Sequence, residues 1–155
     1  MDETNRITGK DIGMARASLT RISNELARFL VGTLGLNLQG AEVLVLRGRK
    51  TGKSRSLVVN PLEIDGETYL MSARGQSAWV RNLRASGEGT LRRGQKRREF
   101  RANELTDGEK LSAMRAYLHK WGWQVKSFMG VDGKSSDDEI RAILPNHPMF
   151  LLTFR

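Results

Sequence analysis

Apolar residues recur at helical spacing near the start of the chain and form short β-type runs further along. The apolar positions of the first segment are Leu19, Ile22, Leu26, Phe29 and Leu30. Spacings of three and four residues predict an amphipathic helix from Met14 to about Gly32. Residues 1–13 are polar and are predicted to form a flexible N-terminus. We therefore expect a short flexible segment followed by a single domain over residues 14–155.

The middle and the end of the chain carry short β-type segments. Asp65-Gly66 and Gly94-Gln95 are typical two-residue hairpin turns. Pro61 cannot donate a ladder hydrogen bond, so its strand should be bulged or lie at an edge near this point. The predicted strands cover residues 43–46, 57–64, 68–72, 90–93, 97–104 and 149–154.

Three helices are predicted after the first strands. A short helix covers residues 77–85. Thr106 and Glu109 have capping-box spacing and open a helix to about Lys120. A last short helix begins near Ser136 and stops before Pro145. About six mostly antiparallel strands, an N-terminal helix and flanking helices indicate an α+β fold, a small split β-barrel rather than a doubly wound sheet.

Composition restricts the chemistry. The 155 residues suffice for one domain. Lys and Arg number 26 against 17 Asp and Glu, and this net charge of +9 indicates an anionic partner. Without cysteine, and with only two histidines in no metal-binding spacing, we expect no thiolate chemistry and no metal site. No signal peptide and no run of roughly 20 apolar residues is visible, so we expect a soluble cytoplasmic protein.

The most basic segment is the predicted turn between the first two strands. Residues 47–55 contain five cations and no acid, and two glycines let the backbone approach a ligand closely. Guanidinium and ammonium groups on a hairpin suit a phosphate or a cluster of carboxylates. The P-loop pattern GxxxxGK[ST] is absent, so this is not a nucleotide-binding loop of that kind. A solvated hairpin tip with surplus charge is the alternative interpretation.

A second candidate segment joins the strand at 68–72 to the short helix. The first turn of such a helix offers free N–H groups to an anion, and Ser72 and Arg74 can add side-chain donors. Trp79 and Leu83 are interpreted as core residues. Asn82, beside a core tryptophan, should need a buried hydrogen-bond partner.

These segments together resemble a known family. The motifs are Gly48-Arg49-Lys50-Thr51-Gly52-Lys53-Ser54-Arg55, Asn60-Pro61-Leu62, Ala73-Arg74-Gly75, Trp79-Val80-Arg81-Asn82-Leu83-Arg84-Ala85 and His147-Pro148-Met149-Phe150. In this order they resemble the deazaflavin-dependent nitroreductase family, whose members are split β-barrels that use coenzyme F-420. The similarity runs in register from about Ala41 to Glu104.

The resemblance implies F-420, rather than FMN, as the coenzyme. Its phosphate and oligoglutamate tail would bind the basic hairpin, and residues 72–75 would line the phospholactyl and ring region. Trp79 and Asn82 would support or touch the coenzyme, and Pro61-Leu62 would flank its ring. The implied contacts are Arg49, Lys50, Thr51, Gly52, Lys53, Arg55, Pro61, Leu62, Ser72, Ala73, Arg74, Gly75, Trp79 and Asn82.

The implied reaction is hydride transfer from reduced F-420 to an apolar organic acceptor such as a quinone, an enone or a nitro compound. The coenzyme would carry the chemistry, with orientation and water exclusion supplied by the protein. Ser72 and Tyr69 are the candidate proton donors. The alternatives are a non-catalytic flavin or deazaflavin carrier and a basic nucleic-acid-binding domain.

The sequence departs from the family at three places. Ser54 replaces a frequent proline, and the segment between Gly75 and Trp79 is shorter than in nitroimidazole-reducing members. Those members place tyrosines in a late helix, where this chain has aromatic and Met residues at a different spacing: Tyr117, Trp121, Trp123, Phe128 and Met129. Trp121 and Trp123 occupy that region instead, as a substrate wall or as core.

Two further basic segments have alternative interpretations. The hairpin over residues 92–101 contains only Phe100 for base stacking, so a barrel edge protected by charge is favoured over a nucleic-acid surface. The N-terminal helix covers one barrel end or contacts an anionic membrane through its arginines.

Overall fold

The computed structural model describes residues 40–155, which lie in one compact unit. The flexible segment 1–13 and the helix expected from Met14 to about Gly32 lie outside the described residues. Their interpretation therefore stays a prediction, as does any contact of that helix with a membrane or a barrel end.

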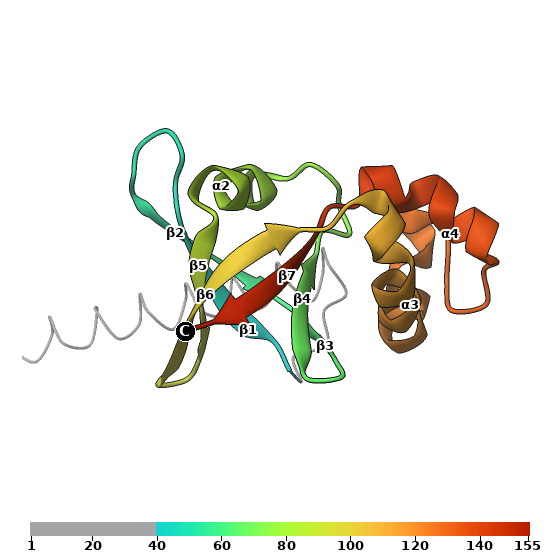
Figure 1. Ribbon diagram of the computed structural model, residues 1–155, viewed down its shortest axis with the longest axis horizontal. Helices are drawn as coiled ribbons and strands as arrows, with labels where there is room; N and C mark the ends of the chain where they lie inside the picture. The colour runs from blue at the N-terminus through green and yellow to red at the C-terminus, as the bar shows by residue number, and fades with distance from the viewer. Residues whose placement is uncertain (1–39) are drawn as a thin grey trace, which may run out of the picture. The chain divides into compact units, whose positions relative to one another are not determined.

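Seven antiparallel strands form one curled sheet in the order β2-β1-β5-β6-β7-β4-β3. Burial alternates along β1, whose even-numbered side chains are buried and whose odd-numbered ones are not. Figure 1 shows the curled sheet with its helices, which together form the expected split β-barrel of the α+β class. The strands are β1 (Glu42–Arg47), β2 (Ser54–Val59), β3 (Leu62–Ile64), β4 (Glu67–Met71), β5 (Glu88–Arg93), β6 (Lys96–Glu104) and β7 (Met149–Phe154).

The seventh strand arises because the strand expected over residues 57–64 is divided. The chain leaves β2 after Val59 and enters β3 at Leu62, with Pro61 in the break. β2 and β3 are the two edges of the sheet, where a residue without an N–H is tolerated. The expectation of an edge position near Pro61 is thus confirmed. At the next turn, Asp65 and Gly66 both have positive φ, as the tight hairpin requires.

The second hairpin is not the barrel edge that the sequence suggested. β5 pairs with β1 and β6, and β6 pairs with β5 and β7. Within this hairpin, the start of β6 at residues 96–98 pairs with β5 but not with β7. The edge interpretation is wrong because a cluster of charged residues does not reveal how many neighbouring strands pair with a strand.

Helices cover the ends of the sheet (Figure 1). They are α2 (Ala78–Ser86), α3 (Asp107–Met129), α4 (Asp137–Ile143) and a 3-10 turn, η1 (Leu144–Asn146). α3 begins at the expected Thr106 capping box but continues beyond Lys120 to Met129. Gly122 lies inside this helix and does not end it. A Cβ there would stand 2.9 Å from Gly133 N and 3.1 Å from Asp132 Cα, so the glycine lets the following loop pack closely against the helix.

Two hydrophobic clusters hold the fold together. One lies under α2 inside the sheet, around Leu44, Leu83 and Phe100. The other joins α3 and α4 to β3 and β4, around Met114 and Trp121. Trp121 is buried and packs on Tyr117, whereas the side chain of Trp123 is 77% exposed. Core packing therefore accounts for Trp121 but not for Trp123.

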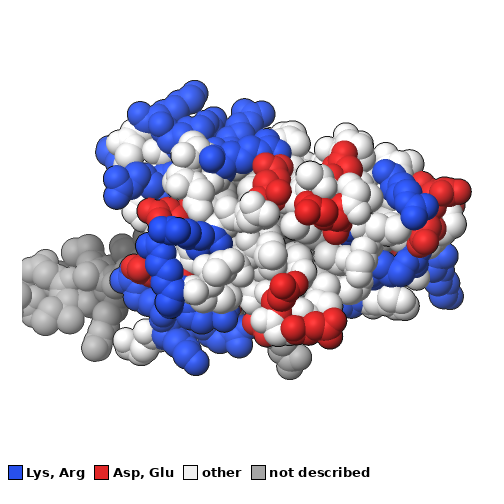
Figure 2. Space-filling view, viewed as in Figure 1, with Lys and Arg blue, Asp and Glu red and all other residues white. Residues whose placement is uncertain are grey.

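Cations gather over two separate areas of the surface (Figure 2). One lies over the β1–β2 loop and α2, and the other over the β5–β6 turn. The end formed by α3 and α4 carries both signs of charge. In the described part of the chain, no helix is both long and apolar enough to cross a membrane.

Candidate functional site

A cavity of about 600 Å³ lies between the β1–β2 loop and α2. Its volume is in the range typical of small-ligand sites. Leu46, Leu57 and Trp79 contribute apolar surface to its wall, while the cations come from the loop. The lining residues are Leu46, Gly48, Arg49, Lys50, Thr51, Arg55, Leu57, Ser77, Ala78, Trp79 and Asn82. No carboxylate is among them.

The loop is a six-residue connection with a defined backbone. The N–H of Gly48 donates to Lys53 O at 2.8 Å, and the N–H of Gly52 donates to Gly48 O at 2.8 Å. Gly52 has φ +70, a conformation that favours glycine. Thr51 Oγ1 accepts a hydrogen bond from the Lys53 N–H at 3.3 Å. These bonds turn the loop so that Arg49 and Lys50 line the cavity.

Asn82 joins α2 to this loop. Its Oδ1 accepts hydrogen bonds from the backbone N–H of Arg49, at 3.2 Å, and from Arg49 Nη1, at 2.9 Å. Asn82 is buried, so it has the partner that the sequence required. Trp79, one turn earlier in α2, packs against Phe150 in the core with 6.0 Å between ring centroids. It also lines the cavity, while its expected contact with the coenzyme stays a prediction.

The N-terminus of α2 opens on the same cavity. Ser77 precedes the helix, and its side chain makes no capping hydrogen bond. The first turn contains no acidic residue. The first N–H groups of a helix have no helical partner and carry partial positive charge. Ser77 and Ala78 line the cavity, so this helix end adds to its preference for an anion.

The turn from Ser72 to Gly75 precedes α2 without lining the cavity. Ser72 is buried and its Oγ donates to Gly75 O at 2.6 Å. Gly75 has φ +77, and the Arg74 guanidinium lies over the Phe128 ring at 5.1 Å. Ala73 packs against the cluster that joins α3 to the sheet. The structure thus brings this turn to the start of α2 but leaves it beside the cavity wall.

Pro61 and Leu62 are buried at the break between the two edge strands. Neither lines the cavity; Leu62 packs in the cluster under α3. The neighbouring Asn60 Oδ1 is buried and has no hydrogen-bond partner within residues 40–155. A buried acceptor without a donor costs free energy, so this amide oxygen is available to a donor group.

The two candidate proton donors differ in environment. The Tyr69 hydroxyl donates to Glu67 Oε2 at 2.6 Å. This hydrogen bond, together with burial and the charges of Glu67 and Asp65, raises the pKa of Tyr69 to about 12. The Ser72 hydroxyl is engaged by Gly75 O. Both protons are therefore held by protein acceptors, and neither residue lines the cavity.

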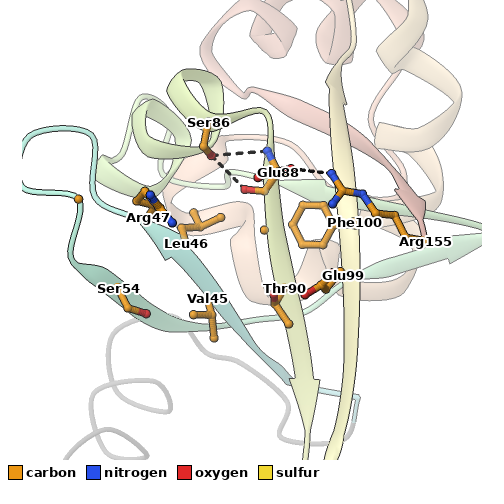
Figure 3. A pocket seen from close by; sticks show the side chains of 12 residues that line it. Val45, Leu46, Arg47, Ser54, Ser86, Glu88, Thr90, Glu99, Phe100 and Arg155 are labelled. Atoms are coloured by element: carbon orange, nitrogen blue, oxygen red, sulfur yellow. Dashed lines mark hydrogen bonds and ion pairs between the residues drawn. The ribbon is translucent and has the colours of Figure 1, made fainter.

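A second cavity, of about 540 Å³, lies beside the same loop (Figure 3). Gly52 is the only predicted coenzyme contact that lines it. Its charged side chains have both signs: Arg155 Nη2 pairs with Glu88 Oε2 at 2.6 Å, and Arg47 and Glu99 also line it. Because carboxylates repel an anion, the first cavity is the better site for an anionic ligand.

Six of the predicted contacts line one cavity: Arg49, Lys50, Thr51, Arg55, Trp79 and Asn82. Lys53 belongs to the same loop but lines neither cavity. The prediction omitted Leu46, Gly48, Leu57, Ser77 and Ala78. Strand alternation could have given the two leucines, since they pack into the cluster beneath α2, and the position before the helix could have given Ser77. Within the described residues, no group of three or more His, Asp or Glu could hold a metal ion.

The family model of the F420H(2)-dependent quinone reductases matches residues 19–129, most of the chain. The chain belongs to this family. F-420 is therefore its coenzyme, and it is an F-420-dependent reductase, as the resemblance implied. The cavity fits that coenzyme: cations and a helix N-terminus suit its anionic tail, and the apolar wall suits its ring. No curated protein matches the chain.

Solved structures share the fold at low sequence identity. The protein Atu2129 from Agrobacterium tumefaciens str. C58 has a TM-score of 0.54 and 15% identity, over 74% of this chain and 48% of that one. An F420-H2 dependent reductase, FDR-A, has a TM-score of 0.51 and 16% identity, over 74% and 95%. A putative pyridoxamine 5'-phosphate oxidase from Listeria innocua has a TM-score of 0.50 and 11% identity, over 75% and 84%. The present chain thus spans about half the length of Atu2129 but nearly all of FDR-A.

Proposed function

We propose that this F-420-dependent reductase transfers hydride to a quinone or to another apolar organic acceptor, such as an enone or a nitro compound. The observation that carries the proposal is the cavity between the β1–β2 loop and α2, in which three cations face an apolar wall and no carboxylate is present. The family's description as quinone reductases supports the choice of acceptor.

The basic loop and α2 would bind the anionic tail of the coenzyme. Arg49, Lys50 and Arg55 supply charge-assisted donors, and the first N–H groups of α2 add partial positive charge. Asn82 would hold the loop in place through Arg49. Binding at several fixed points orients a ligand without using any reactive side chain of the protein.

The apolar wall would support the ring system and keep water away from it. Trp79, Leu46 and Leu57 form this wall. When bound, reduced F-420 supplies a hydride, and the acceptor takes up that hydride and one proton. The protons of Tyr69 and Ser72 are held by Glu67 and Gly75 O. Water is therefore the favoured proton source, with these two residues as the alternative donors.

Titration of the purified protein with F-420, followed by the coenzyme's fluorescence, tests the site. We expect Lys50→Ala and Arg55→Ala to weaken binding by roughly tenfold each, the effect of losing one charge-assisted contact. The matched control is Arg92→Ala with Arg97→Ala, which removes two exposed cations from the other hairpin. Unchanged affinity in the loop variants, or equal losses in the control, would reject the assignment.

Turnover distinguishes a reductase of apolar acceptors from a coenzyme carrier. Oxidation of reduced F-420 would be followed with a quinone, an enone and a nitro compound in separate assays. Consumption of the quinone in step with coenzyme oxidation supports the proposal. Coenzyme binding without oxidation by any of the three would favour the carrier instead.

A further inference from the structure

The segment between β4 and α2 is fixed by residues that lie far along the chain. The N–H of Ser72 donates to Pro148 O at 2.9 Å. A Cβ on Gly75 would stand 3.0 Å from Asn146 O, so the turn and the end of η1 are in close contact. These contacts fix the two ends of the turn. Within the turn, the carbonyl oxygen of Ser72 accepts a hydrogen bond of 3.2 Å from the Gly75 N–H, which leaves its second lone pair for another donor.

His147 satisfies that carbonyl group. Its Nδ1 lies 3.0 Å from Ser72 O, and only 8% of the residue is exposed. A carbonyl oxygen can only accept, so Nδ1 carries the proton, and Nε2 is the unprotonated nitrogen of the neutral ring. The imidazole thus acts toward the turn as a fixed N–H donor.

His147 is itself held from two directions. Its backbone N–H donates to Leu144 O at 3.1 Å, and Lys110 Nζ donates to the same oxygen at 2.9 Å. Lys110 is 4% exposed and also pairs with Asp107 Oδ1 at 2.8 Å. Hydrogen bonds therefore run from α3 through Leu144 and His147 to Ser72. The position of the turn depends on the helices at the far end of the sheet.

We propose that His147 is a positioning residue for the coenzyme, holding the turn from Ser72 to Gly75 in its binding conformation by donating from Nδ1 to Ser72 O. The inference rests on the proposed function, in which the start of α2 binds the coenzyme. The turn leads into that helix, since Gly75 O accepts from the N–H of Ser77, which lines the cavity. Without the donor, the Ser72 carbonyl loses the shorter of its two hydrogen bonds and keeps only the one from the Gly75 N–H, at 3.2 Å. Rotation of that peptide relieves the cost and moves Gly75 and the start of α2.

Paired substitutions separate this role from simple packing. The side-chain N–H of His147→Asn occupies about the place of Nδ1–H, whereas His147→Leu fills the space without a donor. We expect the Asn variant to bind F-420 as the wild type does and the Leu variant to bind it about tenfold more weakly. At saturating coenzyme both should keep the wild-type kcat. Equal affinity of the Leu and Asn variants would overturn the proposal.

Loss of stability has its own control. Val125→Ala removes buried methyl groups from α3 and leaves every hydrogen bond of His147 and the turn in place. It should lower Tm, as His147→Leu does, yet leave the F-420 affinity unchanged. If His147→Leu does not fold, His147→Gln replaces it. The longer Gln side chain places its amide near the position of Nε2 and so leaves no donor at the position of Nδ1. A Val125→Ala variant that loses coenzyme affinity as His147→Leu does would contradict a specific role.

A measurement without coenzyme distinguishes this inference from the proposed function. The amide N–H groups of Gly75 and Ser77 donate within the turn, to Ser72 O at 3.2 Å and to Gly75 O at 2.8 Å. We expect faster hydrogen exchange at both in the Leu variant and wild-type exchange in the Asn variant. If the wild type failed to bind F-420, the proposed function would be wrong. Hydrogen exchange would still show whether His147 holds the turn, because it is measured without coenzyme. Unchanged exchange in the Leu variant would show that His147 does not hold the turn.

Discussion

Asn82 Oδ1 accepts two hydrogen bonds from Arg49, from its backbone N–H at 3.2 Å and from its guanidinium at 2.9 Å. The two residues lie 33 positions apart, on α2 and on the tip of the β1–β2 loop. One buried amide thus fixes the backbone of the loop and the direction of its first cation. The cations and the start of α2 consequently face the same cavity.

Asn82→Leu should uncouple the loop from α2. It fills a similar volume but removes both hydrogen bonds, at a cost of about 1–3 kcal/mol in the free energy of unfolding. F-420 affinity should fall by roughly tenfold, because the loop is no longer held in its binding conformation. Urea unfolding and fluorescence titration measure the two effects. Ser86→Ala is the control on the same helix, since its hydroxyl bonds to Asn82 O, Glu88 O and the Glu88 N–H and, within the described residues, to no group of the β1–β2 loop. Wild-type affinity in Asn82→Leu would contradict the role of this contact.

Coenzyme binding should depend on ionic strength. Lys50 and Arg55 are exposed at the cavity, and salt screens exposed charges over about 10 Å at 0.1 M. Raising the salt from about 0.05 M to about 0.5 M should therefore weaken F-420 binding to the wild type. The double variant Lys50→Ala, Arg55→Ala should respond less steeply. Parallel salt dependence in both proteins would show that other cations hold the coenzyme.

Stability should decline on mild acidification because of His147. Burial lowers its pKa below 6.5, the hydrogen bond to Ser72 O opposes this shift, and the charge of Lys110 adds to it. Below about pH 6.5 the unfolded chain binds a proton that the folded chain resists, so stability is full above this pH and falls beneath it. Urea unfolding between about pH 6.5 and 5 should show the loss in the wild type and a smaller one in His147→Asn. This window lies above the range in which Glu104 and Asp132, whose pKa values are lowered, take up protons. If the free energy of unfolding fell equally with pH in the wild type and in His147→Asn, groups other than His147 would cause the loss.

Local rules were sufficient for most of the fold. The short apolar run 43–46 predicted β1, the Asp65-Gly66 turn predicted the β3–β4 hairpin, and Thr106 with Glu109 marked the start of α3. The end of α3 was missed because Gly122 usually weakens a helix. Here the glycine is needed for the close approach of Gly133, a contact that no local pattern contains. The partners of β5 and β6 are likewise set by the whole sheet.

The candidate site was predictable where one segment supplies both charge and backbone shape. The β1–β2 loop was recognised from its cations and glycines, and Asn82 from its expected need for a partner. The role of His147 could not be read from the sequence, because its contact with Ser72 joins positions 75 residues apart. Leu46 and Leu57 were missed for another reason. Strand alternation could have placed them against the core, but a leucine packed there does not by itself show that a cavity opens beside it.

Two glycine-to-alanine substitutions should have opposite effects on stability. A Cβ on Gly89 would stand 2.6 Å from Leu46 Cδ2, 2.8 Å from Phe100 Cζ and 3.1 Å from Val45 O. Gly89→Ala must displace core side chains and one backbone oxygen, at a cost of about 1–3 kcal/mol. In the first turn of α3, a Cβ on Gly108 meets nothing within 4 Å. Gly108→Ala should therefore stabilise the protein by up to about 1 kcal/mol, because the unfolded chain loses freedom that the helix does not need. Urea unfolding compares both variants with the wild type. A Gly89→Ala variant as stable as the wild type would mean that β5 can move away from β1 at this point, and the packing inside the sheet would have to be looser than the structure shows.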